Sequence, residues 1–196
     1  MASFSERTKR RLRDELLDAA YDALVAGGYE GLRMADIARR TGVSRQTVYN
    51  ELGDKWDVLQ AVATRETERF LVLVNEALAE HERDAIAGLR AAVDRALTLA
   101  SDNPLIKAAL TAPGSDQASQ LLTTRGHQIL ELCHQRLDTH VRSHWPDVSP
   151  DDARLGVDIA LRVVLSHIVN PAGAPATVAD EVARVLGPFL SAASER

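Results

Sequence analysis

The stretch Met34-Ala-Asp-Ile-Ala-Arg-Arg-Thr-Gly-Val-Ser-Arg-Gln-Thr-Val-Tyr-Asn-Glu-Leu-Gly-Asp-Lys55 sets the architecture of the N-terminal part of this chain. It has the pattern of two short helices joined by a tight turn. Gly42 can adopt the positive φ that ends the first helix. Ser44 fits the N-cap of the second helix, where its hydroxyl accepts a hydrogen bond from a free backbone N–H. With Val48 facing inward, the stretch predicts a helix-turn-helix.

A helix that begins after Ser44 presents polar side chains on its first two turns. Such a helix can enter the major groove of DNA, where arginine pairs with guanine and glutamine pairs with adenine. We therefore expect Arg45 and Gln46 to contact base edges. The full predicted set of contacts from this helix to bases or phosphates is Ser44, Arg45, Gln46, Thr47, Tyr49 and Asn50.

The order and spacing of several motifs resemble a known family over roughly residues 8–60. A helix rich in Arg and Leu is followed by Gly27-Gly28-Tyr29, Ile37-Ala38, Gly42-Val43-Ser44, Val48-Tyr49 and Lys55. In this respect the chain is similar to the DNA-binding region of the TetR/AcrR family of bacterial one-component repressors. The resemblance implies that Lys55 contacts a phosphate. Arg33 replaces the usual Thr or Ser cap of the second helix, so that cap must come from elsewhere, and Leu52 is expected to occupy the core position of an aromatic residue.

The composition indicates an all-α protein. Of the 196 residues, 45% are hydrophobic, 26% are charged and only 4% are aromatic, and alanine and leucine, both good helix formers, are abundant. No apolar run approaches the roughly 20 residues of a membrane span, and the N-terminus lacks a hydrophobic signal region. The single cysteine, Cys133, has no partner for an intrachain disulfide. We therefore expect a cytoplasmic protein with no membrane contact.

The net charge of −5 is unevenly distributed along the chain. Residues 1–55 hold ten Lys/Arg and nine Asp/Glu, whereas the remainder holds thirteen and nineteen, so the acidic excess lies in the C-terminal part. Attraction to phosphates depends on local charge, so the overall sign does not exclude DNA. Five basic residues near the start form either a backbone-contacting arm or a solvated, disordered tail: Arg7, Lys9, Arg10, Arg11 and Arg13.

The periodicity and the Pro/Gly breaks predict about nine helices and two domains. We expect a DNA-binding domain over 1–55 and a ligand-binding and dimerisation domain over 56–196. Besides the two short helices described above, the predicted helices cover residues 5–26, 55–82, 84–100, 104–110, 116–145, 151–169 and 177–194.

The last two predicted helices carry more apolar surface than a single contact would use. A helix that is apolar around most of its circumference is buried around most of it. We favour a two-fold four-helix dimer interface, which the resemblance also implies; the alternative is that both helices complete the core of one protomer. The predicted interface residues are Leu155, Ile159, Val163, Val178, Val182, Leu186 and Phe189.

The resemblance also implies an effector pocket in the second domain. The expected lining is Phe70, Val74, Leu78, Val93, Leu97, Leu122, Ile129 and Cys133. Periodicity alone gives only buried faces, and by that measure a plain core role is favoured over a pocket role for each of these residues. A lining of this kind suits an apolar or amphipathic small molecule, such as a fatty acyl or lipid-like compound.

Two helical pairs have metal-ligand spacing, His140 with His144 and Glu131 with His134. Neither has a second pair elsewhere, and Cys133 has no nearby Lys or Arg to activate its thiol. We therefore expect no metal, no cofactor and no enzymatic activity. The favoured function is a ligand-responsive, dimeric repressor of a palindromic operator in double-stranded DNA, released by a small-molecule effector. An activator or ligand-insensitive regulator of the same fold, or an α-helical metal-dependent enzyme, remain the alternatives.

Overall fold

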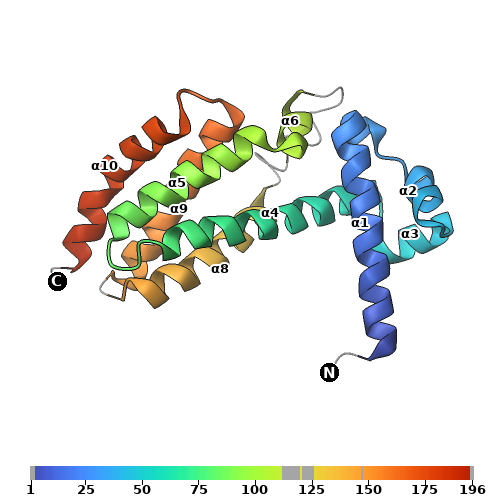
Figure 1. Cartoon of the computed structure of the whole chain (residues 1–196), viewed down its shortest axis with the longest axis horizontal. Helices are drawn as coiled ribbons and strands as arrows, with labels where there is room; N and C mark the ends of the chain where they lie inside the picture. The colour runs from blue at the N-terminus through green and yellow to red at the C-terminus, as the bar shows by residue number, and fades with distance from the viewer. Residues whose placement is uncertain (1–2, 112–119, 121–125, 147, 195–196) are drawn as a thin grey trace. The chain divides into compact units, whose positions relative to one another are not determined.

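The computed structural model of the chain describes residues 3–111, 120, 126–146 and 148–194, without the side chains of residues 189–194 (Figure 1). Throughout these ranges the regular secondary structure is helical, which confirms the predicted all-α fold. None of the helices in the described ranges is both long enough and apolar enough to cross a membrane.

The chain divides into two compact units, each with its own core. The first unit comprises residues 1–66 and 104–124, and the second comprises residues 67–103 and 125–196. The first unit therefore extends past the border expected at residue 55. Its extension follows from the first turns of the fourth helix, which bury Val58, Leu59 and Val62 to 0%, 3% and 0% exposure.

The first unit is built around the N-terminal helix. It contains α1 (Phe4–Gly31), α2 (Met34–Thr41), α3 (Arg45–Leu52), the start of α4 (Lys55–Ala79) and α6 (Pro104–Thr111). Helix α1 contacts α2, α3 and α6, and α2 contacts α3. The core side chains Leu16, Leu24, Ile37 and Val48 are almost fully buried, and each contributes roughly 1.5–3 kcal/mol by leaving water. Leu52 is also buried, which confirms the core position expected for it.

Helix α1 begins earlier and ends later than the sequence predicted. The Ser3 hydroxyl accepts a hydrogen bond from the Glu6 backbone N–H, and the Glu6 side chain accepts one from the Ser3 N–H, forming a capping box. Gly27 and Gly28 leave helical geometry, Gly28 with φ 59°, but the chain resumes for a further turn to Gly31.

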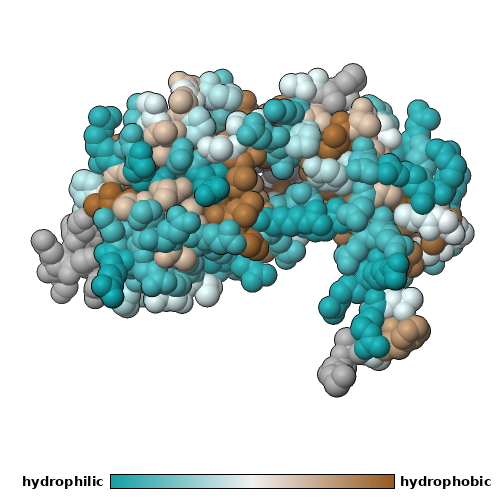
Figure 2. Space-filling view, viewed as in Figure 1, coloured by the Kyte–Doolittle hydropathy of each residue, from teal (hydrophilic) through white to brown (hydrophobic). Residues whose placement is uncertain are grey.

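The five N-terminal basic residues lie on this helix, so the alternative of a disordered tail is wrong, whereas their role as a backbone-contacting arm stays a prediction. The capping box and the side-chain contacts along the helix hold these residues in helical conformation. Arg7, Lys9, Arg10, Arg11 and Arg13 are all exposed. Figure 2 shows that the N-terminal half of α1 is covered mainly by hydrophilic side chains.

The second unit is a bundle formed by the remainder of α4, α5 (Ala85–Asp102), α8 (His127–His144), α9 (Pro150–Val169) and α10 (Pro175–Ser194). Helix α5 packs along α10 and α8 packs along α9, while α9 also contacts α5 and α10 (Figure 1). Of the helix predicted over 116–145, the described part begins at His127. A single apolar cluster from all five helices forms the core of this unit.

The structure separates the residues predicted for the dimer interface into two groups. Val178, Val182 and Leu186 on α10 are only 3%, 6% and 6% exposed and belong to the protomer's own core, so they are not free to contact a second copy. Periodicity identified this apolar face, but not which helix would cover it. Leu155 and Ile159 on α9 are 48% and 36% exposed, Val163 is half-buried against the core, and the side chain of Phe189 lies outside the described residues.

Candidate DNA-binding surface and ligand cavity

The turn between α2 and α3 follows the geometry expected from the sequence. Gly42 adopts a left-handed conformation with φ 70°, and both its N–H and that of Val43 donate to the Ala38 carbonyl. A residue with a side chain would be strained at this φ. At the other end of α2, Arg33 occupies the N-cap with no side-chain cap. The replacement cap expected there is therefore absent from the described residues, and only the Arg33 carbonyl accepts bonds, from the Asp36 and Ile37 N–H groups.

Helix α3 begins with a side-chain cap. The Ser44 hydroxyl accepts a hydrogen bond of 3.0 Å from the Thr47 backbone N–H, and the two side-chain oxygens of Ser44 and Thr47 lie 2.9 Å apart. Both hydroxyls are therefore engaged in fixing the first turn of the helix. This arrangement holds the start of α3 in a defined position, which direct readout of bases requires.

The outward face of α3 is exposed in the part of the chain that the structure describes. Arg45, Gln46, Tyr49 and Asn50 are all exposed, Tyr49 to 42%, whereas Val48 on the opposite face is fully buried. The Gln46 amide nitrogen donates to the Asn50 side-chain oxygen at 2.9 Å. The four exposed side chains thus form a polar surface one helix wide, the shape and chemistry that the major groove accepts.

Lys55, expected from the resemblance to contact a phosphate, lies at the start of α4. Its ammonium group lies 4.2 Å from the centroid of the Tyr29 ring, a cation–π contact within the first unit. Asp54 precedes it, accepting hydrogen bonds from the Trp56 and Asp57 N–H groups at 2.8 and 3.0 Å. A ring face takes up none of the N–H donors of the ammonium in a conventional hydrogen bond, so the contact with Tyr29 orients Lys55.

Two basic residues of α1 hold α3 in a way that the sequence analysis missed. The Arg13 guanidinium donates to the Glu51 backbone carbonyl in the last turn of α3, where a cation is favourable. The Lys9 ammonium lies 3.9 Å from the Glu51 carboxylate. In the sequence, only Glu51 pointed to these contacts. It is an acidic residue at the end of α3, the predicted recognition helix, and α1 is rich in basic residues that could pair with it.

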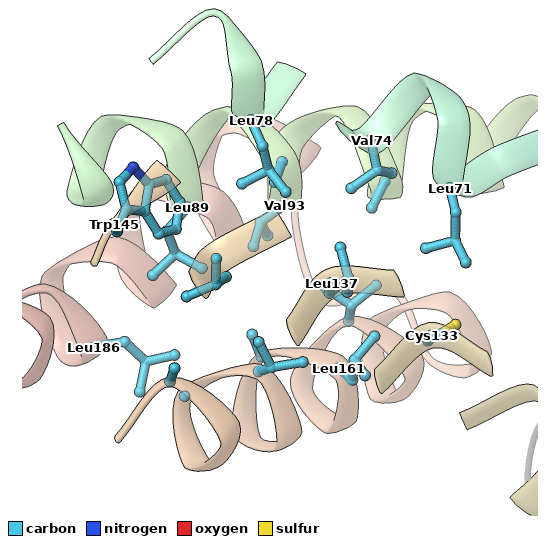
Figure 3. Close-up of a pocket in the computed structure, with 18 of the residues that line it drawn as sticks. Leu71, Val74, Leu78, Leu89, Val93, Cys133, Leu137, Trp145, Leu161 and Leu186 are labelled. Atoms are coloured by element: carbon cyan, nitrogen blue, oxygen red, sulfur yellow. The ribbon is translucent and has the colours of Figure 1, made fainter. Parts of the chain in front are cut away.

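The second unit contains a cavity of about 110 Å³. It lies between α4, α5, α8 and α9, with Leu186 of α10 closing part of one side (Figure 3). Its walls are apolar, and among the residues that the structure describes no charged side chain lines it. Among the predicted lining residues, the structure places Phe70, Val74, Leu78, Val93 and Cys133 in the wall.

Two other predicted pocket residues do not line this cavity, and a third is not among the described residues. Leu97 belongs to the same core but contacts other side chains. Ile129 is half-buried and outside the wall, and Leu122 lies outside the described residues. Helical periodicity assigned Leu97 and Ile129 to a buried face correctly, but it does not tell which part of that face remains unfilled. The sequence analysis also missed Trp145, which lines the cavity and is only 7% exposed.

The thiol of Cys133 is buried in the cavity wall. Burial raises its pKa from an ordinary value of 9.0 to about 11, because the thiolate loses hydration that no neighbouring cation replaces. Cys133 is therefore a packed, protonated thiol, as the sequence predicted, and has neither the charge nor the exposure of a nucleophile.

The histidines form ordinary side-chain pairs. The His140 and His144 rings are stacked with centroids 4.0 Å apart, the His144 Nε2 atom lies 3.6 Å from a Glu82 carboxylate oxygen, and His134 lies 3.1 Å from Asp158. Burial lowers the pKa of His140, with a smaller contribution from the nearby His144. Within the described ranges no group of three or more His, Cys, Asp or Glu side chains could hold a metal ion.

Two models of known protein families match this chain. The family described as "Bacterial Tetracyclin repressor, C-terminal domain" matches residues 84–188, and that described as "Bacterial regulatory proteins, tetR family" matches residues 16–62. The chain belongs to the TetR family.

Two curated relatives support this assignment. The HTH-type transcriptional regulator AlkX of Mycobacterium tuberculosis is 28% identical over 186 residues, covering 95% of this chain and 88% of AlkX. The uncharacterized HTH-type regulator TtgW of Pseudomonas putida is 29% identical over 138 residues, covering 70% of this chain and 91% of TtgW.

A solved structure of similar fold is also that of a TetR-family protein. It is the repressor AlkX from Dietzia sp. strain DQ12-45-1b, implicated in biodegradation of n-alkanes, with a TM-score of 0.78 and 26% identity, covering 92% of this chain and 95% of that one. Because the family and these relatives are transcription regulators, this TetR-family chain is a DNA-binding regulator and not an enzyme.

Proposed function

We propose that this TetR-family protein is a dimeric repressor that leaves a palindromic operator when an alkyl-chain effector enters the cavity of the second unit. The observation that carries the proposal is the apolar wall that the described residues give this cavity, in a chain whose α3 surface is exposed. The steps of the proposal concern the bases that α3 contacts, the pairing of two copies, and the nature of the effector.

Arg45 and Gln46 are the base-reading residues in this proposal. Both are exposed on the first turn of α3, and the amide of Gln46 keeps one hydrogen and its carbonyl oxygen available after bonding to Asn50, which suits the bidentate contact to adenine. Thr47, Tyr49 and Asn50 contact bases or the backbone beside them. Ser44 and Lys55 contact phosphates at the two ends of the helix.

Selection of bound DNA from a random pool tests this assignment, with Arg45→Ala and Gln46→Ala compared against Arg154→Ala, an exposed arginine of the second unit. Losing one bidentate contact costs about 1–3 kcal/mol of discrimination at one base pair. Each of the first two variants should relax the preference at one position in each half-site, and the control should not. An unchanged preference in both would show that other side chains read the bases.

The exposed apolar side chains of α9 support a two-fold dimer. Leu155 and Ile159 are spaced four residues apart and lie on one side of the helix, with 48% and 36% exposure, and Val163 continues this stripe one turn further on. Val185 of α10 is 70% exposed and adds to the apolar surface available for pairing. A dimer places two recognition helices on half-sites about 34–36 Å apart, or a multiple of that distance.

The effector class follows from the cavity wall. A charged group placed among apolar side chains with no polar partner loses several kcal/mol of hydration, so the part of the effector inside the cavity is a hydrocarbon chain. The related AlkX of Dietzia is implicated in biodegradation of n-alkanes, at 26% identity, which supports the same class here. At about 110 Å³ the cavity resembles in size the apolar cavities that hold benzene, so longer chains require the wall to move.

Helix α4 couples the two functions in this proposal. Its first turns bury Val58 and Val62 in the first unit, and its later turns supply Phe70 and Val74 to the cavity wall. An effector that separates the wall acts on the same helix that anchors the DNA-binding unit. For a hundredfold loss of operator affinity, the effector must bind the DNA-free form about a hundredfold more tightly, roughly 2.7 kcal/mol.

Operator binding in the presence of octane, 1-octanol or octanoate tests the effector class. We expect operator affinity to fall with octane or 1-octanol. Ala160→Phe, which fills the cavity from a half-buried wall position, should keep operator binding and lose the response. If none of the three compounds changes the operator affinity of the wild-type protein, the proposed effector class is wrong.

A further inference from the structure

We infer that Trp145, held in place against Gly88, closes one end of the cavity and sets the longest alkyl chain that the cavity accepts. This inference rests on the proposed function, because it concerns the specificity of the same cavity. Neither residue stood out in the sequence: Trp145 follows the last turn of α8, and Gly88 lies within α5.

Trp145 lies at one end of the cavity. Figure 3 shows the labelled lining residues distributed from Leu71 and Cys133 at one end to Trp145 and Leu186 at the other. Trp145 and Leu186 are 7% and 6% exposed, so buried side chains form this end of the cavity, as Leu71 and Cys133 do at the other end with 4% and 9% exposure. An alkyl chain that lies along the cavity therefore has the Trp145 indole at one of its ends.

Gly88 is the contact that positions the indole. A Cβ atom at residue 88 would lie 2.6 Å from Cζ2 and 3.0 Å from Cη2 of Trp145, closer than packed carbon atoms approach. The indole ring therefore packs directly against the backbone of α5, in space that the Cβ atom of any other residue at position 88 would occupy. On another side, the His140 ring meets the indole edge to face, with centroids 6.5 Å apart and planes at 79°.

These contacts make the indole a rigid stop rather than an adjustable part of the wall. A tryptophan side chain has two rotatable bonds, and here the ring is confined between α5 and His140. Two substitutions at this contact should act in opposite directions. Gly88→Ala forces the indole away from α5 and shortens the cavity, whereas Trp145→Ala removes the stop and lengthens it.

The measurement is the affinity of the full-length protein for a series of n-alkanols of increasing length, followed by displacement of the fluorescent probe 1-anilinonaphthalene-8-sulfonate. Each methylene buried in an apolar site tightens binding about fourfold. This gain in affinity ends at the chain length at which the end of the alkanol contacts the Trp145 indole. We expect this break point to move to longer alkanols in Trp145→Ala and to shorter alkanols in Gly88→Ala.

Leu97→Ala is the matched control, because Leu97 is buried in the same core without lining the cavity, and its break point should equal that of the wild type. Trp145→Phe, which keeps an aromatic ring but shortens it, should move the break point in the same direction as Trp145→Ala and replaces that variant if it fails to fold. Alanine is the better helix former, so Gly88→Ala does not weaken α5 itself.

The outcomes separate this inference from the proposed function. Break points that coincide in the wild type, Gly88→Ala and the tryptophan variants would overturn the role of Trp145 while leaving the alkyl-chain effector intact. Movement of the break point in the same direction in Gly88→Ala and Trp145→Ala would overturn it as well. If the wild-type protein binds no alkanol, the proposed effector class fails, and this inference fails with it.

Discussion

The reactivity of Cys133 provides a direct measure of both the cavity and its electrostatics. At about pH 8, a thiol with a pKa of 9.0 is about 9% thiolate, whereas one with a pKa of about 11 is only about 0.1% thiolate. Because the thiolate is the reacting form, the folded protein should react with a disulfide reagent such as 5,5′-dithiobis(2-nitrobenzoic acid) about a hundredfold more slowly than an exposed thiol. Burial at 9% exposure slows it further.

The assay follows the absorbance of the released thiolate, and the unfolded chain in concentrated urea is the matched control because it carries the same single cysteine. The rate for the folded protein should keep rising about tenfold per pH unit beyond pH 9, as the higher pKa requires. Saturating 1-octanol should slow it again, since Cys133 lines the cavity. A rate within tenfold of the unfolded control, or a plateau near pH 9, would refute the burial of the thiol.

Three further predictions concern the recognition helix, the dimer and pH. Ser44→Ala removes the cap of α3 and should lower the free energy of unfolding by about 1 kcal/mol, measured by urea denaturation; Ser44→Asp, which restores an acceptor, should recover it. Ile159→Asp places a charge on the exposed stripe of α9, so sedimentation should show half the wild-type mass, and an unchanged mass would move the interface elsewhere. Burial and His144 lower the pKa of His140, against the opposing effect of Glu82. The unfolded chain therefore takes up a proton more readily, and stability should be complete above about pH 6.5 and fall as the pH drops below it. His140→Gln should flatten that fall, and an identical pH profile would exclude His140 as its source.

The DNA-binding half of the molecule was predictable because its determinants are local. The left-handed Gly42, the cap at Ser44 and the buried Val48 each depend on residues within a few positions of one another, and the structure shows all three as expected. The attachment of α1 to α3 was not predictable in the same way. Arg13 contacts the carbonyl of Glu51, 38 residues away, and no periodicity reports such a pairing.

The second unit shows what depends on packing between distant segments. Periodicity identified the apolar faces of α9 and α10, yet an apolar face covered by its own chain and one left for a second copy have the same pattern. Packing against α5 places Val182 in the core, while Ile159 stays exposed. The packing of Trp145 against Gly88 likewise brings together residues 57 positions apart in the sequence. The helices, their caps and the recognition surface follow from interactions between residues close together in the sequence. The cavity and the exposed apolar surface, in contrast, exist only once the helices have packed, because each is defined by what the neighbouring helices leave unfilled or uncovered.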